Sequence, residues 1–155
     1  MKLRKVLRYI NSANKHISPR RFRKQSVNVA WIKADDIKIR LGKLIKLSDL
    51  PYNIENITAL RSYSSKSRAY ARIWGLSKVW QLSLNLKPHY IIEVLSEKYD
   101  KLPDVKKDEV LLHELAHIPQ NFSGSLLPHI KHGKRNFRNR VDKLIKSVNL
   151  NSRYK

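Results

Sequence analysis

Residues 110 to 118 contain two histidines four positions apart, His113 and His117, with Glu114 directly after the first. If this run is helical, residues four apart lie on one face, so both imidazoles can bind the same zinc ion. Glu114 lies on the neighbouring flank, where its carboxylate can take a proton from metal-bound water. The pattern His-Glu-x-x-His therefore predicts a zinc site with Glu114 as catalytic base.

The motif lies among apolar residues, which predicts a helix that is buried on nearly all sides. A polar face in such a helix would be desolvated without compensation unless a metal or another partner satisfied it. This setting makes metal binding a better explanation of the two histidines than packing. The apolar neighbours are Val110, Leu111, Leu112, Leu115, Ala116 and Ile118.

A catalytic zinc usually has three protein ligands, so the sequence must supply one more. The chain has no cysteine, which leaves histidine and carboxylate as ligands. His129 follows a loop after the motif, and His132 comes three residues later. Asp142 is the only acid after Glu114. We favour His129, with His132 as the next candidate and Asp142 as a further alternative.

Positive charge is the second dominant feature. The chain has 33 Lys and Arg against 12 Asp and Glu, a net charge of +21 and a pI near 10.4. Residues 1–34 contain ten basic residues and residues 56–92 contain six, both without an acid, and residues 118–155 contain nine against one. Three long segments of one sign favour nucleic-acid contact over a merely solvated surface.

The expected nucleic-acid surface includes a basic arm over residues 1–30, the loop around Arg68 and the outer face of the last helix, which includes Arg138 and Arg140. Residues 151–155 are expected to form a basic tail. The arm is either disordered or ordered by phosphates, and the loop around Arg68 is either a solvated hairpin or a binding loop with stacking tyrosines. Ribosomal RNA or a ribonucleoprotein is favoured over DNA. The predicted contact residues are Arg20, Arg21, Arg23, Lys24, Lys66, Arg68, Arg72, Lys134, Arg135 and Arg138.

Residues 31–150 are expected to form a single α+β domain with a small sheet of three or four strands packed on helices. Its first helix lies within residues 31–50 and is capped by Asp35 or Asp36. The motif helix starts with Asp104 as cap and ends at Pro119, and an amphipathic helix follows near residue 141. The expected strands are 57–63, 70–74, 79–84 and 90–95, the last presenting backbone to a peptide substrate.

No long apolar segment follows the basic N-terminus, so we expect neither a signal peptide nor a membrane span. This pattern predicts a cytoplasmic protein.

Several stretches together resemble archaeal metallopeptidases related to the phage metallopeptidase and SprT-like zincin groups. The resemblance covers roughly residues 30–150. It implies a compact zincin fold, one zinc on His113 and His117 with His129 as third ligand, and Glu114 as base. SprT-like proteins also have a later His-Gly pair, here His132 and Gly133, so His132 stays an alternative. The matching stretches are Ser67–Leu76, Trp80–Gln81, Tyr90–Val94, Lys101–Leu102, His113–Gly124 and Pro128–His129.

Two functions follow from these features. The first is a zinc peptidase that its basic surface localises on nucleic acid or a ribonucleoprotein. The alternative is a non-catalytic, rRNA-binding protein of the ribosome built on a zincin fold. Glu114 favours the first, because a purely structural zinc has no use for a general base, whereas the charge favours the second.

Overall fold

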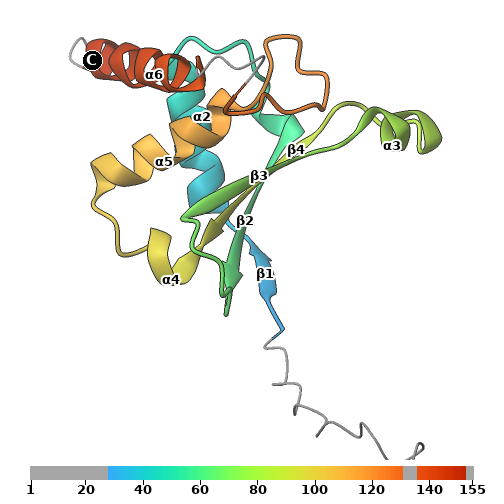
Figure 1. The fold of residues 1–155 in the computed structure, drawn as a ribbon, viewed down its shortest axis with the longest axis horizontal. Helices are drawn as coiled ribbons and strands as arrows, with labels where there is room; N and C mark the ends of the chain where they lie inside the picture. Colours follow the sequence, from blue (N-terminus) through green and yellow to red (C-terminus); the bar gives the residue numbers. More distant parts are fainter. Residues whose placement is uncertain (1–27, 131–135, 153–155) are drawn as a thin grey trace, which may run out of the picture.

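A computed structural model describes residues 28–130 and 136–152. They form an α+β arrangement in which helices pack on one side of a four-stranded mixed sheet (Figure 1). The predicted α+β class is therefore confirmed. In chain order the elements are β1 (Ala30–Lys33), α2 (Asp35–Leu47), the short 3-10 helix η1 (Ile54–Asn56), β2 (Ile57–Tyr63), β3 (Ala71–Gly75), α3 (Lys78–Ser83), β4 (Tyr90–Leu95), α4 (Ser96–Tyr99), α5 (Asp104–Ala116) and α6 (Phe137–Ser152).

The strand order in the sheet is β1-β2-β4-β3. Strand β4 pairs in parallel with β2 and antiparallel with β3, and β1 pairs antiparallel with β2. Because β4 is hydrogen-bonded on both sides, it has no free backbone edge. The expectation that residues 90–95 present backbone to a substrate is therefore wrong. Strand β3, at the end of the sheet, is the strand beside α5 that has an edge to offer.

The core lies between the sheet and the helices, and strand alternation decides which residues enter it. On β4 every second residue from Tyr90 to Val94 is buried in this core, and β2 contributes Ile57 and Ala59. Helix α2 confirms the helix expected within residues 31–50 and contributes an apolar stripe at helical spacing. Its buried members include Ile37, Leu41, Leu44 and Ile45.

Residues 79–84 do not form the predicted strand, because helix α3 (Lys78–Ser83) and its C-cap residue Leu84 occupy these positions. Their alternating apolar pattern resembles a strand, but the β3–β4 ladder ends at the pair Gly75 and Tyr90, so the connection between these residues lies outside the sheet. Gln81 is buried and its Nε2 donates to the carbonyls of Leu76 and Ser123 at 2.7 and 2.8 Å. The apolar side chains of α3, such as Trp80, stay exposed. Strand β1 was not predicted.

The predicted helix caps are wrong in detail. Helix α2 has Ala34 as its N-cap and α5 has Pro103, and neither makes a side-chain cap hydrogen bond. Asp35, Asp36 and Asp104 instead lie in the first turns, where a negative charge interacts favourably with the helix dipole. Helix α5 ends at Ala116, three residues before the predicted stop at Pro119. The backbone amides of His117 and Ile118 donate to carbonyls three residues back, where an α-helix would require four.

Helix α6 carries the expected apolar face, with Leu144 and Val148 buried. One predicted outer-face residue, Arg140, instead turns inward. Its guanidinium donates to the carbonyls of Ala116 and Ile118, both at 2.9 Å, so it holds the end of α5. The helix also extends through residues 151 and 152, which the sequence had placed in the tail.

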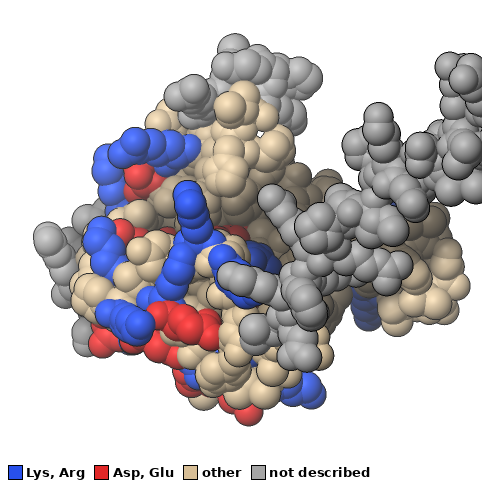
Figure 2. All heavy atoms as spheres, turned by 60° about the horizontal axis from the view of Figure 1, so that its bottom comes forward, with Lys and Arg blue, Asp and Glu red and all other residues tan. Residues whose placement is uncertain are grey.

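Charge on the described surface is mixed and not uniformly basic. On the face shown in Figure 2, Lys and Arg side chains lie among Asp and Glu. Several cations are engaged by acids, including Arg40 with Asp108 at 2.6 Å and Arg61 with Asp36 at 2.8 Å. Among the described residues, none of the helices combines the length and apolar composition needed to cross a membrane.

Candidate metal centre

The structure brings three histidines together at the end of α5. His113 lies on the helix, His117 is its C-cap residue, and His129 comes from the loop that follows. One ring nitrogen from each can be chosen so that all three lie within 4.8 Å of one another. The Nε2 atoms of His113 and His129 face each other at 3.1 Å. This cluster contains the two motif histidines and the favoured third candidate.

A backbone contact orients the ring of His117. Its Nδ1 lies 2.6 Å from the Leu127 carbonyl oxygen, which fixes Nδ1 as the protonated donor. The Nε2 lone pair is then free for a metal, the arrangement that metal-binding histidines usually show. The Leu127 amide donates back to the His117 carbonyl at 2.8 Å, so the loop closes on the residue it orients.

Gly124 and Tyr90 hold the loop between His117 and His129 against the sheet. Gly124 has a φ of 86°, and its amide donates to the Tyr90 hydroxyl at 2.8 Å. A Cβ at Gly124 would lie 2.2 Å from both the Leu76 carbonyl oxygen and the Gln81 side chain. Only glycine fits this backbone. The position of His129 thus depends on a close approach between the loop and the β3–β4 connection.

Phe137, at the start of α6, packs against all three histidines and is only 8 % exposed. Its ring stacks on that of His117 with centroids 4.2 Å apart. It meets His113 and His129 edge-on, at 5.1 and 4.7 Å. Phe137 therefore walls the cluster from one side. Sequence reasoning missed this residue, because its spacing matches an ordinary buried position of an amphipathic helix.

Burial keeps the motif histidines in the neutral form that a metal requires. Desolvation, with smaller repulsion from His117 and His129, lowers the pKa of His113 from 6.5 to about 4. Desolvation also lowers the pKa of His117, partly offset by its hydrogen bond to Leu127. Neutral imidazoles are ready ligands, since no proton must leave before a cation binds.

Glu114 is 8 % exposed, and burial raises the pKa of its carboxyl from 4.5 to about 7. Among the described residues, no hydrogen bond or ion pair engages this carboxylate. It lines a cavity of about 700 Å³ together with His113, His117 and His129. A carboxyl that titrates near neutrality beside three ligand candidates is suited to moving protons.

Apolar residues from β3 and α6 form most of the remaining wall of this cavity. Ala71 and Ile73 enter from β3, and Val141 and Ile145 from α6. Tyr70, a tyrosine of the basic loop around Arg68, precedes β3 and lines the same cavity as the histidines. The site is therefore an apolar trough whose polar groups converge at one end.

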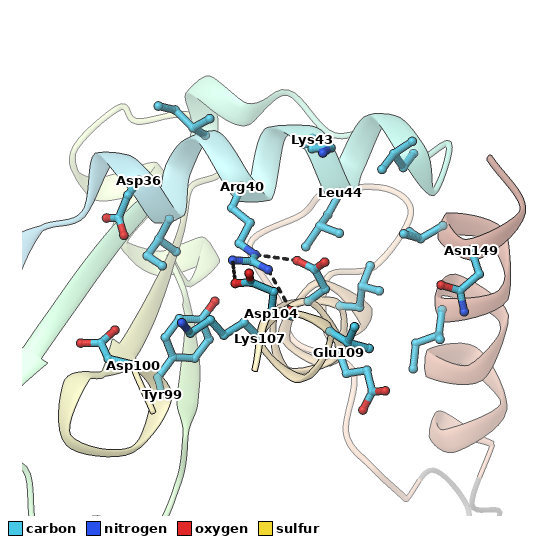
Figure 3. Close-up of a pocket in the computed structure, with 18 of the residues that line it drawn as sticks. Asp36, Arg40, Lys43, Leu44, Tyr99, Asp100, Asp104, Lys107, Glu109 and Asn149 are labelled. Atoms are coloured by element: carbon cyan, nitrogen blue, oxygen red, sulfur yellow. Dashed lines mark hydrogen bonds and ion pairs between the residues drawn. The ribbon is translucent and has the colours of Figure 1, made fainter. Parts of the chain in front are cut away.

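A second cavity, of about 720 Å³, lies between α2, α5 and α6 (Figure 3). Arg40 crosses it from α2, and its guanidinium bonds Asp108 at 2.6 Å and Asp104 at 3.1 Å. The Tyr99 phenol also lines it, and burial raises the pKa of this hydroxyl. Because the central cation is paired with acids of the same cavity, we interpret this space as an interhelical cleft and place the chemistry at the histidines.

The other predicted site residues have varied positions. Lys66 and Arg68 are exposed between β2 and β3, whereas Arg72 on β3 faces Glu93. Arg138 is exposed and lines a small cavity beside His113, together with Asp142, which is not a member of the three-histidine cluster. The residues His132, Arg20, Arg21, Arg23, Lys24, Lys134 and Arg135 lie outside the described residues.

The three imidazoles fit a metal ion by number, convergence and protonation, and a neighbouring carboxylate completes the pattern. An α+β domain with His-Glu-x-x-His on a buried helix and a third converging histidine has the organisation of a metallopeptidase. The family described as "Putative phage metallopeptidase" matches residues 29–149, and the chain belongs to this family. Such a family implies a metal. No match was found among curated proteins or among solved structures.

Proposed function

We propose that this protein is a zinc-dependent peptidase in which His113, His117 and His129 hold the metal and Glu114 is the catalytic base. The observation that carries the proposal is the convergence of three histidines beside a buried glutamate that opens into the same cavity. A set of three imidazole nitrogens favours zinc over magnesium or calcium, which prefer oxygen ligands.

A zinc ion held by these three histidines would supply Lewis-acid polarisation of the scissile carbonyl and a lower pKa for the attacking water. Glu114 accepts the proton of that water on a carboxylate oxygen. It then delivers the proton to the amide nitrogen as the C–N bond breaks, which leaves one new carboxyl and one new amine. Burial, which raises the pKa of the Glu114 carboxyl in the metal-free site, favours the uptake of this proton.

The substrate we propose is an extended peptide that lies along the outer edge of β3. An edge strand offers unpaired backbone groups to an added strand, and β3 also lines the cavity that contains Glu114. The apolar wall from Ile73, Val141 and Ile145 would accommodate an apolar side chain next to the cleaved bond. Peptides with leucine or phenylalanine there should be cleaved faster than those with aspartate.

We further propose that the basic segments bind nucleic acid, with ribosomal RNA or a ribonucleoprotein as partner. Residues 1–34 contain ten basic residues and no acid, and each phosphate they neutralise would add to the salt dependence of binding. Deletion of residues 1–27 should therefore weaken RNA binding and flatten its dependence on salt while zinc content stays unchanged. Binding that does not depend on salt would contradict this part of the proposal.

The decisive experiment combines metal analysis with a quenched-peptide library. The purified protein should contain about one zinc per chain and should cleave peptides with an apolar residue at the scissile bond. Glu114→Gln should retain the zinc and lose cleavage, because an amide cannot accept the proton. Glu109→Gln, which changes another acid of the same cavity on the same helix, is the matched control and should cleave normally.

Other outcomes separate the alternatives. His129→Ala should lower zinc affinity, whereas full zinc retention would shift the third ligand to another residue. A parent protein that holds zinc, binds ribosomal RNA and cleaves no peptide would favour the non-catalytic ribosomal role. Equal cleavage by Glu114→Gln and the parent would exclude Glu114 as the base.

A further inference from the structure

The sheet has a second face, away from the core helices, that contains two exposed tryptophans. Because side chains alternate along a strand, residues of β4 such as Ile92 face the helices and Glu93 faces the opposite side. Trp31 on β1 and Trp74 on β3 contact Glu93 and so lie on its face. Their side chains are 56 % and 51 % exposed. Two exposed indoles that share one face of a sheet form an aromatic surface, and such surfaces can mark interaction sites.

Both indoles are held by one buried carboxylate. Trp31 Nε1 donates to Glu93 Oε1 at 3.1 Å, and Trp74 Nε1 donates to Glu93 Oε2 at 3.3 Å. Glu93 lies on β4, which is separated from β1 by β2, so Trp31 reaches across a whole strand to make its bond. Each ring is therefore fixed at its N–H edge while part of its surface remains open to solvent.

Glu93 is 1 % exposed, and burying a carboxylate is costly unless hydrogen bonds and charges compensate for it. An apolar residue in the middle of the central strand would avoid this cost. The groups that compensate are the two indoles and Arg72, whose Nη1 lies 3.8 Å from Oε2. The metal site does not use this cluster. What the buried carboxylate provides is a fixed orientation for two exposed aromatic rings.

The charge of this face decides which partner suits it. Arg72 lies beside Glu93 on this face, and Lys33 follows Trp31 by two residues and so points to the same side. Residues 56–92 contain six basic residues and no acid, and the acid of β4 on this face is the buried Glu93. A neutral sugar or an apolar peptide has no need of these cations, whereas a phosphodiester backbone does.

We propose that this face binds single-stranded nucleic acid, with bases stacked on Trp31 and Trp74 and phosphates near Lys33 and Arg72. Aromatic rings on an open sheet, combined with cations, bind bases through stacking that requires them to be unpaired. Glu93 is a positioning residue, since it touches the rings and not the ligand. The surface is independent of the histidine cluster, so its failure would leave the proposed peptidase untouched.

The test uses fluorescence anisotropy with a labelled 12-nucleotide single-stranded RNA of mixed sequence and its duplex as competitor. Trp31→Leu and Trp74→Leu should each weaken binding about 5- to 150-fold, the range expected for loss of one stacked base. Trp80→Leu is the matched control, because Trp80 is also 56 % exposed but lies on α3. It should bind as the parent does, and the duplex should compete poorly.

Tryptophan emission gives a second readout that a folding defect cannot imitate. The chain has three tryptophans, so in Trp80→Leu all indole emission comes from the two proposed stacking rings. Single-stranded RNA should quench a larger fraction of the emission in this variant than in the parent. Glu93→Gln, which keeps the size of the side chain but loses its charge, should reduce that fraction because the rings are no longer fixed.

Several outcomes would overturn the proposal. Equal affinities for Trp31→Leu, Trp74→Leu and Trp80→Leu would mean that charge alone binds the strand. Effective competition by the duplex, or an absence of quenching in Trp80→Leu, would exclude stacking. Quenching by a neutral oligosaccharide but not by the RNA would assign the face to a different partner.

Discussion

The raised pKa of Glu114 predicts how the stability of the metal-free protein depends on pH. Burial raises this pKa from 4.5 to about 7, so between these values the native state holds a proton that the unfolded chain has released. The stability contributed by the protonated form is present below pH 4.5 and is lost as pH rises through 7. Glu114→Gln removes the titrating group and with it this loss.

The magnitude follows from the difference between the two pKa values. A separation of about 2.5 units at 1.36 kcal/mol per unit corresponds to about 3 kcal/mol. The variant should therefore gain about 3 kcal/mol relative to the parent between about pH 4 and pH 8. The lowered pKa of His113 has the opposite effect on stability: the stability contributed by the neutral imidazole is lost as pH falls from 6.5 toward 4. Both proteins retain His113, so to first order its effect cancels in the difference.

Urea unfolding followed by circular dichroism, with zinc removed by a chelator, would measure this difference at several pH values. Glu109→Gln, which changes another acid on the same helix, serves as the control. The difference in the free energy of unfolding between Glu114→Gln and the parent should grow as pH rises. A difference that stays constant with pH, or that shrinks as pH rises, would refute the assignment of a buried, protonated Glu114.

Three further predictions concern stability. Gly124→Ala should lower the free energy of unfolding, measured by thermal unfolding, by at least about 2 kcal/mol, because alanine would have a positive φ and its Cβ would clash with neighbouring atoms. Gly42→Ala in α2 is the control: its Cβ has room, so the variant should be slightly more stable than the parent. Arg140→Met should lower the free energy of unfolding in urea by about 2 kcal/mol, since the Ala116 carbonyl loses its donor while the Ile118 carbonyl keeps the Tyr52 hydroxyl. The exposed Arg138→Met should lower it by under about 0.5 kcal/mol. Zinc removal should lower the melting temperature by at least about 5 °C, and an unchanged value would argue against a bound metal.

The local patterns were reliable where a single element decides the outcome. The stripe at Ile37, Leu41 and Leu44 predicted one face of α2, because helical periodicity is a property of neighbouring residues. The same reasoning placed His113 and His117 one turn apart. It failed for residues 79–84, where an alternating apolar pattern is compatible with either a strand or a short exposed helix and only strand pairing distinguishes the two.

The sequence by itself determined the α+β class, the buried setting of the motif and the one-turn spacing of its two histidines, since all three follow from short-range spacing and composition. Only the tertiary structure decided which later residue joins them. His129 lies beside His113 because the loop closes on Leu127 and passes over Gly124, contacts between residues far apart in the chain. The pairing of β4 on both sides and the inward turn of Arg140 have the same origin. Such contacts depend on how whole elements pack, and the local pattern around each residue does not encode them.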